Sequence, residues 1–184
     1  LSGDSEIDPL VVLDDASDTL LLVSVLPQSE YMTGIQAGEE AVFGTYRLEV
    51  FGENDVTVKE ISFRKSGSVG DFNIQNIRLK KDDDSIAESA EFSSQRIVFT
   101  EPIEIKSGSF AELEMEMDIG SSAKTGENLF FEIPNSWDIT AMVQDSEQEL
   151  VVYGDFPIRT NTKTVADSGV RFKVASENPS ARRV

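Results

Sequence analysis

The chain has 184 residues, 39% hydrophobic and 27% charged, so it is long enough and apolar enough to bury the core of a globular domain. Its 34 acidic and 16 basic residues give a formal net charge of -18, which argues against nucleic acids and anionic membrane surfaces as partners. The lack of cysteine and histidine excludes disulfides, thiolate metal sites and catalytic triads built on either residue.

The N-terminal segment is acidic and leads into the longest apolar run of the chain. After residues 1–18, the run Leu20–Leu26 places apolar side chains on both faces of a strand, and Pro27 ends it. Crossing a bilayer takes about 18 apolar residues, so we expect no direct membrane insertion. We divide the chain into residues 1–30, an acidic segment with this apolar strand, and residues 31–184, a β-sandwich domain.

Two arrangements are open for this apolar strand. Burying its six large aliphatic side chains would stabilise the fold by at most about 9–18 kcal/mol, so we do not expect the strand to remain exposed. It is either a central strand of its own sandwich or a donor strand that completes the sheet of a neighbouring subunit. The linker at residues 28–38 is long enough for the second arrangement. The candidate self-assembly residues are Leu20, Leu21, Leu22, Val23, Val25 and Leu26.

A two-residue alternation begins after this linker. Tyr46–Val50 alternates apolar and polar residues, and the turn-forming residues 52–55 end it. Val56–Phe63 alternates in two opposite phases, with Lys59 and Glu60 at the change of phase. Two such residues shift the pattern by one position, which predicts a β-bulge.

Acidic residues gather where the next strand, Ile77–Leu79, runs into a charged turn. Asp82, Asp83 and Asp84 are candidate calcium ligands there, because Ca²⁺ binds about six to eight oxygens. Smaller acidic clusters lie at residues 14–18 and 145–147, and none has the spacing of an EF-hand loop. A solvated turn is the alternative for the three aspartates. The acidity of the whole chain fits either ordinary solubility or adaptation to divalent cations or high salt.

The clearest strand is Ala111–Ile119, in which every odd position is apolar and every even position is acidic. Glu, Leu and Met favour helices, but a helix would scatter these side chains around its circumference. A strand places Leu113, Met115 and Met117 on one face and the carboxylates on the other. We therefore expect a buried apolar face and a solvated acidic face, with Gly120 ending the strand.

Further short apolar runs are separated by frequent turn-forming residues. They lie at residues 97–99, 103–105, 129–133, 150–153 and 170–174. The best candidate helix, Ser85–Glu91, is short and lacks a clean apolar stripe, so an ordinary loop is its alternative. About ten short strands predict an all-β fold, an antiparallel immunoglobulin-like β-sandwich of Greek-key or jelly-roll type with an N-terminal strand arm.

The order of these features resembles a repeated domain of prokaryotic cell-surface and surface-layer-like proteins. The resemblance covers about residues 34–133, from a turn at Ala37-Gly38, through the strands around Tyr46 and Asn76, to a long alternating strand that ends in Asp118-Ile119. It implies an immunoglobulin-like sandwich and a surface location. It carries over no functional residues, because the pattern holds strands and turns without a chemical motif.

These observations predict a structural role without enzymatic activity. Ser121 and Lys124 have the spacing of a Ser-Lys dyad, but they lie in a turn after Gly120 and not at the start of a helix. We expect a structural subunit of an extracellular or cell-surface filament, pilus or surface layer, whose partners are copies of itself or neighbouring surface proteins. The alternative is a monomeric adhesin or carbohydrate-binding module, whose candidate exposed aromatic residues are Tyr31, Tyr46, Trp137 and Tyr153.

Overall fold

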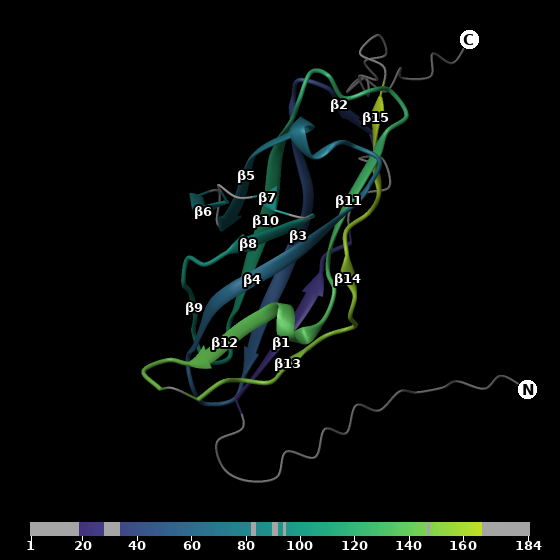
Figure 1. Ribbon diagram of the computed structural model, residues 1–184. Helices are drawn as coiled ribbons and strands as arrows, with labels where there is room; N and C mark the ends of the chain where they lie inside the picture. Colours follow the sequence, from purple (N-terminus) through teal and green to yellow (C-terminus); the bar gives the residue numbers. More distant parts are fainter. Residues whose placement is uncertain are drawn as a thin grey trace, which may run out of the picture.

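The computed structural model describes residues 19–27, 34–81, 84–89, 92–93, 95–146 and 148–166. They form two stacked β-sheets, with β4 and β12 in front of β3 and β10 in the view of Figure 1. The described residues contain no α-helix, only the 3₁₀ turns η2 (Asp71–Asn73) and η3 (Ser136–Asp138). None of these segments is a helix with the length and apolarity that crossing a membrane requires.

Sheet A contains six strands among the described residues. Their order is β13 (Val152–Tyr153), β1 (Leu20–Val25), β3 (Glu40–Phe51), β10 (Phe110–Ile119), β5 (Ile74–Lys81) and β6 (Asp84–Ser89). All neighbours in this sheet are antiparallel except β1 and β13, which are parallel.

Sheet B contains nine strands among the described residues, most of them arranged around the long strand β4 (Val56–Gly67). Its main path runs β2 (Gly34–Gln36), β15 (Lys163–Ala166), β11 (Asn128–Ile133), β4, β8 (Arg96–Phe99) and β7 (Phe92–Ser93). Off this path, β9 (Ile103–Ile105) and β12 (Ile139–Val143) pair with β4, and β14 (Ile158–Arg159) pairs with β11. The predicted all-β sandwich of two sheets is confirmed.

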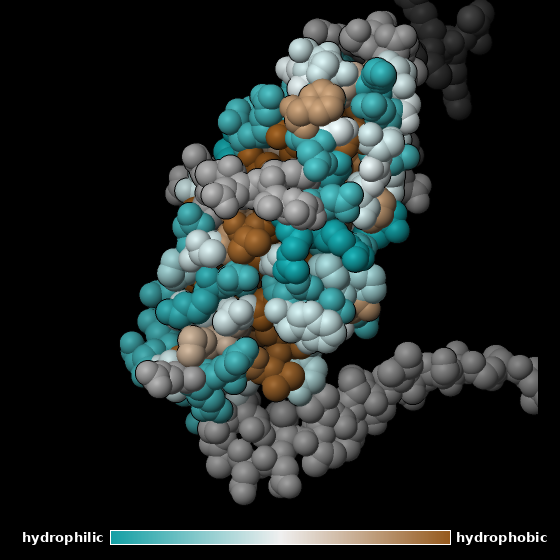
Figure 2. All heavy atoms as spheres, in the orientation of Figure 1, coloured by the Kyte–Doolittle hydropathy of each residue, from teal (hydrophilic) through white to brown (hydrophobic). Residues whose placement is uncertain are grey.

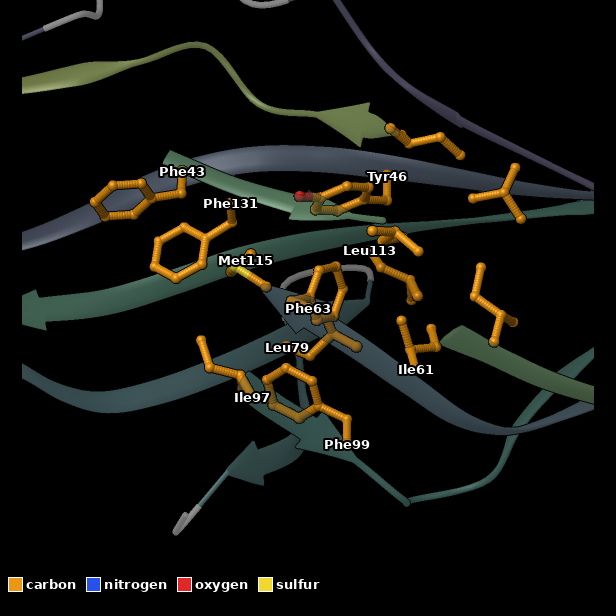
Figure 3. Close-up of a cluster of buried hydrophobic side chains, with 14 of the residues drawn as sticks. Phe43, Tyr46, Ile61, Phe63, Leu79, Ile97, Phe99, Leu113, Met115 and Phe131 are labelled. Atoms are coloured by element: carbon orange, nitrogen blue, oxygen red, sulfur yellow. The ribbon is translucent and has the colours of Figure 1, made fainter. Parts of the chain in front are cut away.

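The core lies between the two sheets, where the alternation of β10 predicted it. Leu113, Met115 and Met117 are fully buried. Figure 3 shows Leu113 and Met115 among aromatic rings that come from both sheets. The ring centroids are 5.1 Å apart for Phe43 and Phe131, 5.0 Å for Tyr46 and Phe63, and 5.8 Å for Phe63 and Phe99. These pairs are tilted or edge-on, the geometry that aromatic quadrupoles favour.

The predicted bulge in β4 is also confirmed. Glu60 lies opposite Thr140 of β12, but the next pair joins Val58 to Ala141, so Lys59 is the extra residue. The bulge restores the inward phase, and both Val58 and Ile61 of β4 are buried.

The segment that offered the best candidate helix is a strand. Asp84–Ser89 forms β6 and pairs with β5, with Ser89 opposite Ile77. The prediction of a helix or loop was wrong because the free edge of β5 provides a backbone partner, which the local sequence does not indicate.

The acidic face of β10 differs from the bare solvated face that its sequence predicts. Lys80 of β5 lies 2.6 Å from Glu116, whose side chain is almost fully buried, and this ion pair raises the pKa of Lys80. Arg78 pairs with Asp118 at 3.3 Å, and Arg47 of β3 lies 3.7 Å from Glu112. Basic residues from both neighbouring strands thus interleave with the carboxylates. This face is a ladder of opposite charges, which cross-strand pairing favours.

Candidate interaction surface at β1

β1, the predicted self-assembly strand, lies inside its own sandwich. It pairs antiparallel with β3 along its whole length, from Leu20 opposite Phe51 to Val25 opposite Tyr46. On its other edge it pairs in parallel with β13. The structure thus shows the first of the two arrangements considered for this strand, and insertion into a neighbouring subunit stays a prediction. The predicted division near residue 30 also stays a prediction, with β1 contributing to the same sheet as β3 and β10.

The two faces of β1 have different surroundings. Leu21 and Val23 point into the core and are 0% and 1% exposed, whereas Leu22 points outward and is 36% exposed. The expectation that the whole apolar run is hidden was therefore wrong for the outer face. Sheet A has no covering layer on that side within the described residues, and apolar sequence on both faces of a strand does not show whether such a layer exists.

The outer edge of β1 is only partly paired. The Leu26 amide donates to the Thr45 carbonyl at 2.8 Å, so the even-numbered residues of β1 direct their backbone groups at β3. The odd-numbered residues direct theirs at the opposite edge. Pairing with β13 ends at Leu22, and no strand among the described residues pairs with Val25 on that side, although β14 lies near β1 across the groove. The N–H and C=O of Val25 therefore face an open edge.

A groove of about 600 Å³ lies along this open edge. It forms where the chain leaves sheet A at Gly154, directly after β13, and crosses to β14 in sheet B. Gly154 packs so closely on β1 that an added Cβ would lie 2.6 Å from the Val23 carbonyl oxygen, which requires glycine. The groove is lined by Leu22 and Val25 of β1 and by Asp155, Pro157, Ile158 and Arg159 of the crossing segment.

Exposed apolar side chains gather on the outer face of sheet A beside the groove, and we name this set the β1 patch. Leu22 lies opposite Tyr153 on β13 and opposite Glu49 on β3, and Glu49 in turn lies opposite Phe110 on β10. The patch consists of Leu20, Leu22, Phe51, Phe110, Val151 and Tyr153, which are between 36% and 64% exposed except for the half-buried Leu20. A contiguous exposed apolar surface is typical of a protein interaction site.

The six predicted self-assembly residues therefore divide among different surroundings. Leu21 and Val23 lie in the core, and Leu20 and Leu22 lie in the β1 patch. Val25 packs against the edge of the core and lines the groove, and Leu26 is half-buried beside Thr45.

Phe51 and Phe110 were not among the residues predicted from the sequence, although their phase indicates an outward position. Val50 and Ala111 lie next to them at buried positions of β3 and β10, so a strand must turn the two phenyl rings outward. Arg47 covers part of one ring, with its guanidinium carbon 3.8 Å from the Phe110 centroid.

The candidate aromatic platform of an adhesin does not assemble as predicted. Tyr46 is buried in the core, and Tyr31 lies outside the described residues. Tyr153 belongs to the β1 patch, whereas Trp137 is 78% exposed in η3, which follows β11 of sheet B. Of the four candidates, the described residues thus place Trp137 and Tyr153 at the surface, and their elements η3 and β13 contact each other.

The calcium prediction falls mostly outside the described residues. Asp82 and Asp83 lie outside them, and Asp84 begins β6. Residues 14–18 and Glu147, from the other acidic clusters, also lie outside. The part of the chain that the structure describes contains no group of three acidic side chains placed to hold a metal ion. Calcium binding at Asp82–Asp84 stays a prediction.

Comparisons with known proteins assign the chain to no family. No family model matches it, and no curated protein matches it. Among solved structures, a family 123 glycoside hydrolase from Clostridium perfringens is 14% identical with a TM-score of 0.42, and the match covers 79% of this chain and 27% of the hydrolase. The sixth cohesin of Acetivibrio cellulolyticus scaffoldin B is 14% identical with a TM-score of 0.36, covering 82% of this chain and 99% of the cohesin. BcpA, the major pilin subunit of Bacillus cereus, is 11% identical with a TM-score of 0.22, covering 74% of this chain and 40% of the pilin.

Proposed function

We propose that this chain is a non-catalytic structural module of an extracellular or cell-surface assembly, such as a filament, pilus or surface layer. In this proposal β1 holds the neighbouring subunit, which is a second copy or another surface protein. One observation carries the proposal: the backbone N–H and C=O of Val25, which no strand among the described residues pairs on this side, lie between an open groove and the β1 patch.

An extended segment of the partner would continue sheet A along this edge. Its backbone would bond to the N–H and C=O of Val25, and alternate side chains would enter the groove beside Leu22 and Ile158. Main-chain bonds give affinity in such contacts, while the pockets for alternate side chains give specificity. The β1 patch would add apolar contact area, which a stable interface of at least about 1,000 Å² needs.

Edge pairing is the form of assembly that the geometry supports best. A donor-strand exchange would require β1 to leave β3, and the apolar contacts of Leu21 and Val23 with the core would be lost until a partner replaced them. Edge pairing breaks none of these contacts. The net charge of -18 disfavours non-specific contact between copies, so the apolar edge would select the contact that forms.

Sedimentation velocity of the full chain over a range of protein concentrations tests this proposal. We expect the sedimentation coefficient to rise with concentration, and Leu22→Lys to abolish that rise by placing a charge in the β1 patch. Val98→Lys is the matched control, because Val98 is 38% exposed, close to the 36% of Leu22, but lies on sheet B.

Two results would contradict the proposal. A wild-type chain that stays monomeric at the highest concentration reached would exclude self-assembly. A wild-type chain that associates equally after either lysine substitution would show that assembly uses a different surface.

A further inference from the structure

The end of sheet B beside η3 carries a small pocket of different chemistry. Its volume is about 150 Å³, and it is lined by Ser62, Arg64, Arg96, Asn135, Trp137 and Asp138. Trp137 is the single tryptophan of the chain and is 78% exposed. An indole this exposed is unusual for so large a ring, since tryptophan is highly buried on average.

The local structure holds Trp137 outward. Asn135 caps η3: its backbone amide donates to Asp138 at 3.1 Å, and the Asp138 carboxylate also accepts a bond from the Asn135 amide group at 3.3 Å. These bonds turn Asp138 inward, where it is 6% exposed, and the intervening indole therefore projects from the surface. Capping of this kind fixes a short turn that would otherwise be mobile.

Two arginines border the pocket, and each is oriented by a buried carboxylate. Arg96 Nη2 donates to Asp138 at 2.7 Å and to the Ser62 hydroxyl at 2.6 Å. The Arg96 side chain is 55% exposed, but that of Asp138 is only 5% exposed. Arg64 Nε donates to Glu132 at 2.8 Å, with the two side chains 52% and 8% exposed. The carboxylates therefore lie beneath the guanidinium groups, which present their outer edges to solvent.

The outer edges of both guanidinium groups can receive a ligand. Each guanidinium has five N–H donors, and within the described residues neither Arg64 nor Arg96 donates a hydrogen bond from Nη1. Arg64 keeps Nη1 and one Nη2 hydrogen, which suit two parallel hydrogen bonds to a carboxylate, whereas both Nη2 hydrogens of Arg96 go to Ser62 and Asp138, so Arg96 offers Nη1 alone. The formal charges of the two ion pairs cancel, so recognition depends on directed hydrogen bonds and not on net charge.

We propose that this pocket binds a carboxylate-bearing sugar, a uronic acid unit of an acidic polysaccharide. The indole of Trp137 offers a flat apolar surface for one side of a sugar ring, and Arg64 and Arg96 offer donors for its carboxylate. The pocket is smaller than the roughly 300–1,000 Å³ typical of sites for drug-sized ligands, so it suits a single ring at the surface of the protein.

The surrounding surface favours a sugar over a protein as the occupant. Val98 is the other exposed large apolar residue on the outer face of sheet B within the described residues, whereas the β1 patch on sheet A has several. Figure 2 shows hydrophilic residues over most of the face that includes β4 and β12, with hydrophobic atoms between them. A protein interface needs a more apolar centre than this face provides.

Titration of the full chain with hexagalacturonate, followed by the fluorescence of Trp137, tests the proposal directly because no other tryptophan contributes. We expect a saturable change in emission. Arg96→Lys keeps the positive charge beside Asp138 but loses the planar fork, and it should weaken binding about tenfold. Arg47→Lys is the matched control on sheet A and should leave the affinity unchanged. Methyl-esterified hexagalacturonate should bind at least about tenfold more weakly, because an ester lacks the two anionic oxygens that accept the directed hydrogen bonds.

Trp137→Ala, measured by calorimetry since it removes the fluorophore, should reduce binding below detection while circular dichroism remains that of the wild type. A titration without saturation would overturn the proposal, as would binding that survives both Arg96→Lys and Trp137→Ala. Hexaglutamate that binds as tightly as hexagalacturonate would show that the pocket accepts acidic peptides, and this result would also overturn the assignment to a sugar.

Discussion

The regions around β1 and η3 share one core but have opposite surfaces. Around β1, the outward positions of four neighbouring sheet A strands and their flanks include exposed Leu, Phe, Val and Tyr beside the ion pairs of Arg47, and the strand edge is open. Around η3, the outward positions hold arginines above buried carboxylates, with one indole. In a sandwich the inward residues determine the fold, so the outward residues are free to differ. One domain can therefore make both an apolar contact at β1 and a polar contact at η3, and substitutions at the outward positions test the two contacts independently.

The largest expected effect on stability is the difference between proline substitutions directed at the two edges of β1. Ser24→Pro removes an amide directed at β3 and should lower the free energy of unfolding by about 3 kcal/mol or more. Val25→Pro removes an amide directed at the groove and part of a side chain at the edge of the core, and should lower it by only about 1 kcal/mol. Urea unfolding of both variants measures the difference. Equal losses of unfolding free energy would show that the assigned directions of the two amides are wrong.

A smaller loss of unfolding free energy is expected at η3, where the buried carboxylate of Asp138 orients Arg96. Arg96→Ala leaves the Asp138 carboxylate without this partner and should lower the free energy of unfolding by about 1–3 kcal/mol. Leu22→Ala in the β1 patch should change it by only about 0.5 kcal/mol, as surface substitutions do. If thermal or urea unfolding gave the larger loss for Leu22→Ala, the β1 patch would be structural and not a free surface.

The core beneath both regions contains the Tyr46 hydroxyl, and its removal should change the free energy of unfolding only slightly. The Tyr46 hydroxyl is buried and has no hydrogen-bond partner among the described residues, and burial raises the pKa of Tyr46 well above its usual range. Tyr46→Phe should therefore leave the free energy of unfolding the same or raise it by up to about 1 kcal/mol. A marked destabilisation in urea unfolding would indicate that the hydroxyl has a partner.

The smallest effect concerns Asp55, which precedes β4. Its carboxylate accepts bonds from Lys106 Nζ at 2.7 Å and from the Ser107 amide at 2.8 Å, and these bonds lower the pKa of Asp55. A lowered pKa contributes stability above the usual carboxyl value of about 3.9 that is lost as the pH falls through the folded-state value. Asp55→Asn should slightly lower the melting temperature at neutral pH. The difference from wild type should disappear in acid, and a difference that grows on acidification would contradict this sign.

Alternation in the sequence was enough to predict the inner layer of the sandwich. In β10 the odd-numbered residues form the core, and in β4 the change of phase located the bulge at Lys59 and Glu60, of which Lys59 is the extra residue. Both are local effects of a side-chain period of two, so a single strand contains the information.

The properties of the surfaces could not be predicted, because they depend on contacts between strands that are distant in the sequence. Glu116 is buried because Lys80 of another strand neutralises it, and the η3 pocket brings together Ser62, Arg96 and Trp137 from separate parts of the chain. The parallel contact of β13 with β1 spans two residue pairs, too few to leave a pattern. The open edge at Val25 follows from where that contact ends, which only the fold determines.

The most direct test of the account is sedimentation velocity of Val25→Pro beside the wild-type chain. We expect the wild type to associate as its concentration rises, and Val25→Pro to stay monomeric while keeping the wild-type circular dichroism spectrum. Undiminished association of a folded Val25→Pro variant would contradict it, because the open edge of β1 would then not be the contact.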